Sequence, residues 1–115
     1  ANAYHAGVKI AFGTDQGLVA HGLNAQEFAL MVDAGMTPAD AIMAATHNAA
    51  DRIGDSKDIG SIQPGRYADI IAVNGDPLAD VTQLFLLFET ITHPRAKLPG
   101  KRTRPRDQRE PARRR

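Results

Sequence analysis

The apolar residues of this 115-residue chain are confined almost entirely to one part of it. Residues 1–94 hold 46 of the 49 apolar residues, and residues 95–115 hold three. The charges divide at the same place, because residues 1–94 carry a net charge of −7 and residues 95–115 a net charge of +8, although the whole chain has a formal charge of +1. Since folding requires apolar surface to bury, only residues 1–94 can form a core.

Several classes of protein are excluded by what the chain lacks. It has no cysteine, which excludes disulfides, a thiolate nucleophile and Cys-ligated zinc, but zinc held by His and carboxylates stays open. The longest uninterrupted apolar run, residues 84–88, is too short to cross a bilayer, and the N-terminus lacks the pattern of a signal peptide. We therefore expect no membrane partner. The chain begins without Met, and we expect that part of the protein precedes it.

Residues 8–12 (VKIAF) form a short, mainly apolar and β-branched run behind Gly7. This composition is typical of a strand buried on both faces of a parallel sheet. One such strand cannot make a sheet by itself, because each parallel strand needs neighbours reached through crossovers. The run therefore predicts the end of a larger α/β structure.

A first helix is predicted at about residues 25–34. Asn24 and Glu27 stand at the spacing of a capping box, in which each side chain satisfies a backbone donor at the helix start. Gly35 follows where a left-handed C-terminal cap is expected.

A second helix is predicted directly after the first. Thr37 is suited to the N-cap, Pro38 to the first helical position and Asp40 to the first turn, and Gly54 marks the end. Its small side chains predict close packing against another element; they are the alanines at positions 41, 44, 45, 49 and 50.

Beyond this helix the pattern changes to that of a small sheet. Residues 61–62 and 68–73 are predicted as two strands joined by a tight turn at Pro64 and Gly65, and residues 84–88 suit another strand.

The character of the chain changes again after residue 93. Four of the seven prolines and ten of the fourteen basic residues lie in residues 94–115, without apolar periodicity, so this segment is predicted to be a disordered basic tail. The chain thus divides into residues 1–54 with the strand and helices, residues 55–93 with the small sheet, and the tail.

Asp15 stands just past the C-terminal end of the predicted strand. In α/β barrels and open α/β sheets the loops at that end converge on one mouth, where ligand-binding and catalytic groups lie. Asp15 is therefore a candidate site residue, although Gly-Thr-Asp by itself also suits a residue that only turns the loop. His21 follows in the same loop, either as a substrate contact or as an exposed residue.

Five blocks of sequence occur in a recognisable order. They are GVKIAFGTD at 7–15, HGLNAQEF at 21–28, AGMTPADAI at 34–42, ATHNAA at 45–50 and GSIQPGRYADII at 60–71. Together they resemble the C-terminal end of an amidohydrolase-superfamily enzyme, closest to the imidazolonepropionase-like and prolidase-like branch. The resemblance covers about residues 1–84.

This resemblance implies an α/β fold and a hydrolytic activity. The chain would be a C-terminal fragment of a (β/α)8 TIM-type barrel, with part of a small composite β-sandwich. The activity would be hydrolysis of a C–N bond, in a cyclic amide or a dipeptide ending in proline, by water activated on a divalent metal, Zn²⁺. Asp15 would be both metal ligand and catalytic carboxylate, and His21 a substrate-binding residue.

The same resemblance places the remaining metal ligands upstream of residue 1, namely a His-x-His pair, a carboxylated Lys or Glu, and two further His. The chain alone is therefore predicted to be inactive and to need the N-terminal part of the barrel. From about residue 85 the sequence departs from the family's closing β-hairpin. We hypothesise that this ending comes from a shifted reading frame or a misassembled gene end.

Two alternatives to an enzyme stay open. The +8 tail could bind nucleic acid or another acidic surface electrostatically, with strong dependence on salt. It has no aromatic residue to stack on a base, so sequence-specific recognition is not expected. The chain could also be an incomplete domain whose exposed apolar faces cause aggregation unless another fragment covers them.

Overall fold

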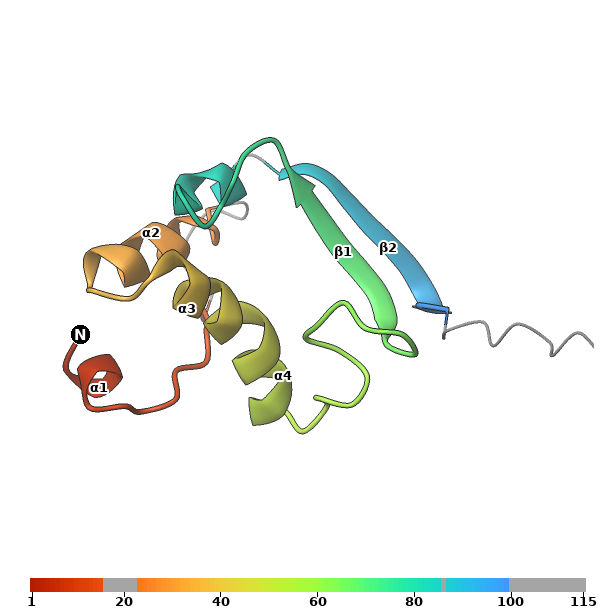
Figure 1. Cartoon of the computed structure of the whole chain (residues 1–115), viewed down its shortest axis with the longest axis horizontal. Coiled ribbons are helices and arrows are strands. Elements are labelled where there is room, and N and C mark those ends of the chain that lie inside the picture. The colour runs from red at the N-terminus through yellow and green to blue at the C-terminus, as the bar shows by residue number, and fades with distance from the viewer. Residues whose placement is uncertain (16–22, 86, 100–115) are drawn as a thin grey trace, which may run out of the picture.

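The computed structural model describes residues 1–15, 23–85 and 87–99. Its helical elements are α1 (Asn2–His5), α2 (Gln26–Asp33), α3 (Pro38–Met43), the π-helical turn η1 (Ala44–Asn48), α4 (Ala49–Arg52) and the 3-10 helix η2 (Val81–Phe85). The strands are β1 (Tyr67–Val73) and β2 (Leu87–Lys97). The helices lie on one side of the two-stranded ribbon (Figure 1). Within the described ranges no helix is long and apolar enough to cross a membrane.

The strand predicted at residues 8–12 is not formed among the described residues. The segment belongs to no strand, and its backbone bonds to a helix instead: the Phe12 N–H donates to the Ala44 carbonyl oxygen at 2.9 Å. A parallel strand requires a neighbouring strand, and the sheet found among the described residues contains only β1 and β2, far along the sequence. The β-type composition of the segment therefore has no partner with which to form a ladder.

The helix α2 confirms the predicted helix, but not its capping box. The helix begins at Gln26, and Asn24 contributes its carbonyl oxygen to the Glu27 N–H at 3.2 Å, with no side-chain cap. Its C-terminal end is as predicted, because Gly35 has φ +102° and its N–H donates to the Val32 carbonyl oxygen at 2.8 Å.

The second predicted helix is confirmed over its whole length, as the continuous run of α3, η1 and α4. The Thr37 hydroxyl caps it by accepting the Asp40 N–H at 3.1 Å, and Pro38 occupies the first helical position. Gly54 ends it with φ +82°. Within this run the π-helical turn η1 was not anticipated from the sequence.

The core is small and is built largely on alanine. Its buried apolar residues are Met36, Ala41, Ala44, Ala50, Val81 and Leu84. The run of α3, η1 and α4, residues 38–52, is called the long helix below. Gly60 packs directly on the long helix, because a β-carbon added there would lie 2.6 Å from the Ala50 Cβ and 2.9 Å from the Thr46 carbonyl oxygen. This approach confirms that the small helix residues serve close packing.

The two strands form an antiparallel ribbon with Ile70 opposite Ile91 at its centre. No strand forms at residues 61–62, and the strand predicted at 84–88 is divided between η2 and β2. The β2 strand continues to Lys97, which pairs with Tyr67, so residues 94–97 of the predicted tail belong to a strand. Residues 100–115 lie outside the described residues.

Arg66 stabilises the loop that precedes β1 through hydrogen bonds. Its guanidinium Nη1 donates to the carbonyl oxygens of Ser56 and of Ile59, the latter at 2.6 Å. The Tyr67 N–H donates to the Asp58 carbonyl oxygen at 2.9 Å. Residues 56–60 are thereby held near the start of the strand, with Gly60 on the helix.

Candidate active site

Asp15 is the last described residue of the N-terminal segment, and its side chain is exposed. Its backbone has φ +46°, in the left-handed region, where every other residue found with positive φ in the described ranges is glycine. Asp tolerates this conformation better than most side chains, and such backbone outliers cluster at functional sites. The residue predicted to carry chemistry therefore has a backbone conformation that non-glycine residues seldom adopt.

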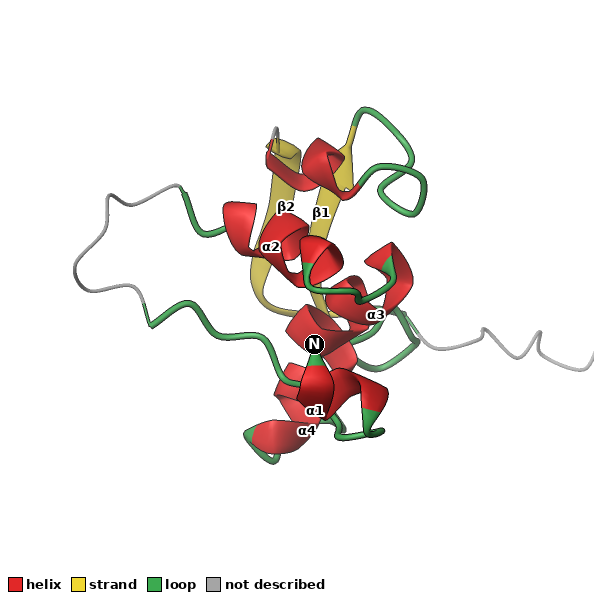
Figure 2. Ribbon diagram, turned by 90° about the vertical axis from the view of Figure 1, so that its left-hand side faces the viewer, coloured by secondary structure: helices red, strands yellow, loops and turns green. Residues whose placement is uncertain are grey.

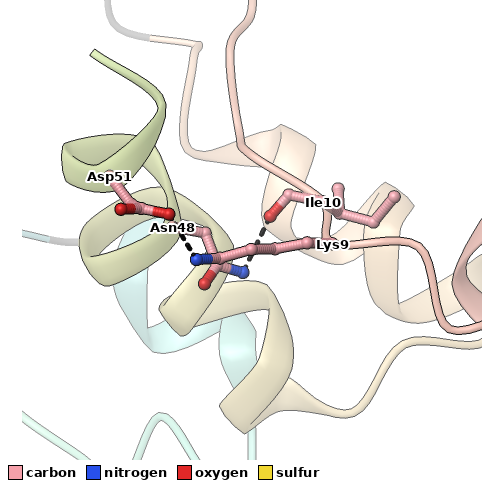
Figure 3. A network of polar contacts seen from close by, with 4 residues as sticks. All are labelled: Lys9, Ile10, Asn48 and Asp51. Atoms are coloured by element: carbon pink, nitrogen blue, oxygen red, sulfur yellow. Dashed lines mark hydrogen bonds and ion pairs between the residues drawn. The ribbon is translucent and has the colours of Figure 1, made fainter. Parts of the chain in front are cut away.

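The segment that leads to Asp15 is attached to the long helix at three points. Besides the Phe12–Ala44 bond, the Asn48 Nδ2 donates to the Ile10 carbonyl oxygen at 2.8 Å. Lys9 Nζ and Asp51 Oδ2 form an ion pair at 2.6 Å (Figure 3). The hydrogen bond from Lys9, together with its charge, lowers the pKa of the Asp51 carboxyl.

A mainly apolar cavity lies beside this segment. Its volume is about 300 Å³, and its lining includes Phe12, Phe28, Leu84 and Phe85. The rings of Phe12 and Phe28 stack with their centroids 4.8 Å apart. The cavity is thus bordered by α2, η2 and the segment before Asp15. Figure 2 shows α2 in front of the ribbon.

The donors available for a metal ion are few in the described part of the chain. No group of three or more His, Asp or Glu side chains there could hold a metal ion. Asp15 offers an exposed carboxylate, an oxygen ligand that divalent ions accept. It fits as one ligand, and the described residues complete no site around it.

The histidines do not add to this site. His21 falls in residues 16–22, outside the described residues, so its predicted role stays a prediction. His47 is exposed on η1. His5 is also exposed, and its Nε2 lies against Gly35, 3.1 Å from where a β-carbon of that residue would be.

Asn48 was not singled out from the sequence, although a signal was present. Asn is disfavoured inside helices, where its side chain competes for backbone hydrogen bonds, and here it stands among alanines. Half-buried in the structure, it uses its amide to bond a backbone carbonyl 38 positions away. A polar residue at an unfavourable helical position was therefore the clue to a tertiary contact.

The family model for the amidohydrolase family matches residues 1–92, and the chain belongs to this family. Members of this family generally use a divalent metal ion, and the structural neighbours imply a TIM-barrel-type fold. The match extends past residue 85, so the departure predicted there was wrong for residues 85–92.

Individual relatives agree with the prolidase-like and imidazolonepropionase-like resemblance. The ochratoxinase of Aspergillus niger is 40% identical over 93 residues, which are 79% of this chain and 19% of that protein. The imidazolonepropionase of Geobacillus kaustophilus is 52% identical over 40 residues, 35% of this chain and 9% of that one. The crystal structure of a Xaa-Pro dipeptidase with bound methionine in the active site superposes with a TM-score of 0.77 at 44% identity, covering 79% of this chain and 22% of that chain. The chain therefore spans about a fifth or less of each of these relatives.

Proposed function

We propose that this chain is the C-terminal part of a metal-dependent hydrolase that cleaves a C–N bond, in a cyclic amide or in a dipeptide ending in proline. Support comes from the amidohydrolase match over residues 1–92 and from relatives named as a dipeptidase and an imidazolonepropionase. The observation that carries the proposal is Asp15, an exposed carboxylate with a left-handed backbone conformation, which follows an anchored segment directly.

The parts of the chain take their places in the larger fold accordingly. Residues 1–54 would supply the last strand and the following helices of a TIM-type barrel, and residues 55–93 part of a composite β-sandwich. In that setting residues 8–12 gain the neighbouring strands that they lack among the described residues. The N-terminal part of the barrel would be the partner that supplies the other metal ligands.

Asp15 would act as a metal ligand and as the carboxylate that moves the proton of the attacking water. When bound, the metal, which we propose to be Zn²⁺, lowers the pKa of its water to about neutral. The Asp15 carboxylate would accept a proton as the water oxygen adds to the carbonyl carbon, and would return it to the nitrogen as the C–N bond breaks, which gives a carboxyl group and a neutral amine. His21 would contact the substrate from the same loop.

Hydrolysis by the complete product of the gene tests this proposal. With Zn²⁺ present, we expect turnover of a Xaa-Pro dipeptide or of a cyclic amide, and Asp15→Asn should lower kcat by roughly 10²- to 10⁴-fold. Asp33→Asn, at an exposed carboxylate in the last turn of α2, is the matched control. Full activity in Asp15→Asn, or turnover of neither substrate class, would contradict the proposal. The 115-residue chain alone should be inactive.

The DNA upstream of residue 1 gives an independent test of the class. We expect it to encode a His-x-His pair at the end of a predicted strand. An upstream reading frame without such a pair would count against a metal-dependent barrel.

A further inference from the structure

We infer that Asn48 is a positioning residue for Asp15, and that it acts by fixing the backbone of residues 10–12. The inference rests on the proposed role of Asp15, but its structural part can be tested without any activity. The evidence is the set of contacts between the N-terminal segment and one face of the long helix, which Figure 3 shows in part.

The contacts run in register along both elements. Going backwards along the segment, Phe12 meets Ala44, Ile10 meets Asn48, and Lys9 meets Asp51. Over these contacts the segment goes from residue 12 to residue 9 while the helix goes from residue 44 to residue 51. The segment and the helix therefore run in opposite directions along the whole set of contacts.

Asn48 is the contact that depends most on side-chain identity. The Phe12–Ala44 bond joins two backbone groups, which other residues at these positions would also supply. The Lys9–Asp51 pair has both side chains 53% exposed, and exposed ion pairs contribute little. The Asn48 amide is half-buried, and its bond to the Ile10 carbonyl oxygen comes from the side chain, so it is lost when that side chain is replaced by one without a donor.

The fixed backbone continues almost directly into Asp15. Only Gly13 and Thr14 separate Phe12 from it, and Asp15 itself holds the left-handed conformation. The π-helical turn that carries Asn48 is a feature common at functional sites. Other contacts hold the helix independently of Asn48, among them the bond from Tyr4 to Asp40. Loss of the Asn48 amide should therefore free residues 10–15 while the helices stay in place.

The test is backbone NMR with amide hydrogen exchange on the 115-residue chain, comparing Asn48→Asp, Asn48→Ala and Asn74→Asp. Asn48→Asp keeps the shape of the side chain but removes the donor at neutral pH. Asn74, exposed in the turn after β1, is the matched control. Both Asn48 variants should lower the protection of the Phe12 amide about tenfold and change the Asp15 coupling that reports φ, with Ala41 and Tyr67 amides unchanged.

Two outcomes would overturn the inference. One is unchanged Phe12 protection and unchanged Asp15 φ in folded Asn48 variants. The other is loss of protection at Ala41 and Tyr67 as well, in both variants, because Asn48 would then hold the whole chain rather than the segment before Asp15. In the complete gene product, the inference predicts that Asn48→Asp lowers kcat with little change in KM. Failure of Asp15→Asn to reduce activity would refute the proposed function but leave the exchange result intact.

Discussion

The phenolic hydroxyl of Tyr4 donates a hydrogen bond to Asp40 Oδ2 at 2.5 Å, which ties α1 to the first turn of α3 across 36 positions. The Thr37 hydroxyl donates to the same carboxylate oxygen at 2.6 Å. The bonds from Thr37 and then from Tyr4 lower the pKa of the Asp40 carboxyl, and the bond to Asp40 raises the pKa of the Tyr4 hydroxyl. The start of the long helix is thus held by its own cap and by the N-terminal segment together.

The Asp40 carboxylate should make the free energy of unfolding decrease at acidic pH. Because the pKa of Asp40 is lower in the folded chain, its contribution is present above the unfolded value, about 3.9, and is lost as pH falls through the folded value. Asp40→Asn should lower the urea midpoint at pH 7 and flatten its decline from pH 5 to pH 2. Asp33→Asn is the control, and an equally steep decline in Asp40→Asn would contradict the prediction. Asp51 and Asp80, whose pKa values are also lowered, contribute to the dependence that remains.

The helix cap can be tested by removing one hydroxyl. Thr37→Ala leaves the Asp40 N–H without its acceptor and should lower the free energy of unfolding by about 1 kcal/mol. Thr46→Ala, in which the lost hydroxyl bonds only the Ile42 carbonyl oxygen of the same helix, should cost less. Urea unfolding followed by circular dichroism measures both, and equal losses would argue against a capping role.

Replacement by alanine should destabilise the fold more at Gly60 than at Gly54, another glycine with a positive φ. Gly60→Ala combines a positive φ of +86° with a β-carbon 2.6 Å from the Ala50 Cβ. Gly54→Ala has a similar φ of +82° but open space around it. The backbone strain, about 1–2 kcal/mol, is common to both, and Gly60→Ala should lose about 1–3 kcal/mol more through overpacking. Thermal unfolding of the two variants checks the difference, which should vanish if the contact with the helix is absent in solution.

The stability of the loop before β1 should depend on the hydrogen bonds that the Arg66 guanidinium donates. Arg66→Met keeps much of the apolar stem but removes the donors to the Ser56 and Ile59 carbonyl oxygens, and should cost about 1–3 kcal/mol of unfolding free energy. The exposed Arg52→Met is the control. Hydrogen exchange should show the Tyr67 amide losing protection in Arg66→Met only. Equal unfolding free energies for the two variants would contradict the prediction.

Prediction from sequence succeeded where a few neighbouring residues decide the outcome. Thr37, Pro38 and Asp40 start a helix through bonds that span three positions, and Gly35 and Gly54 end helices because their backbones accept positive φ. The family resemblance was likewise carried by short blocks in order. The capping box at Asn24 failed because its spacing permits the bonds without requiring them, and the backbone there satisfies the same donor.

The sequence by itself therefore determined the two helices, their ends, the Ala-rich packing face and the family. Only the tertiary structure decided that residues 8–12 lie against a helix instead of in a sheet, that β1 pairs with β2, and that Asn48 reaches Ile10. The physical reason is distance along the chain. Caps and turns satisfy their hydrogen bonds locally, whereas a strand or a buried amide needs a partner tens of residues away, and local pattern does not specify which partner that is.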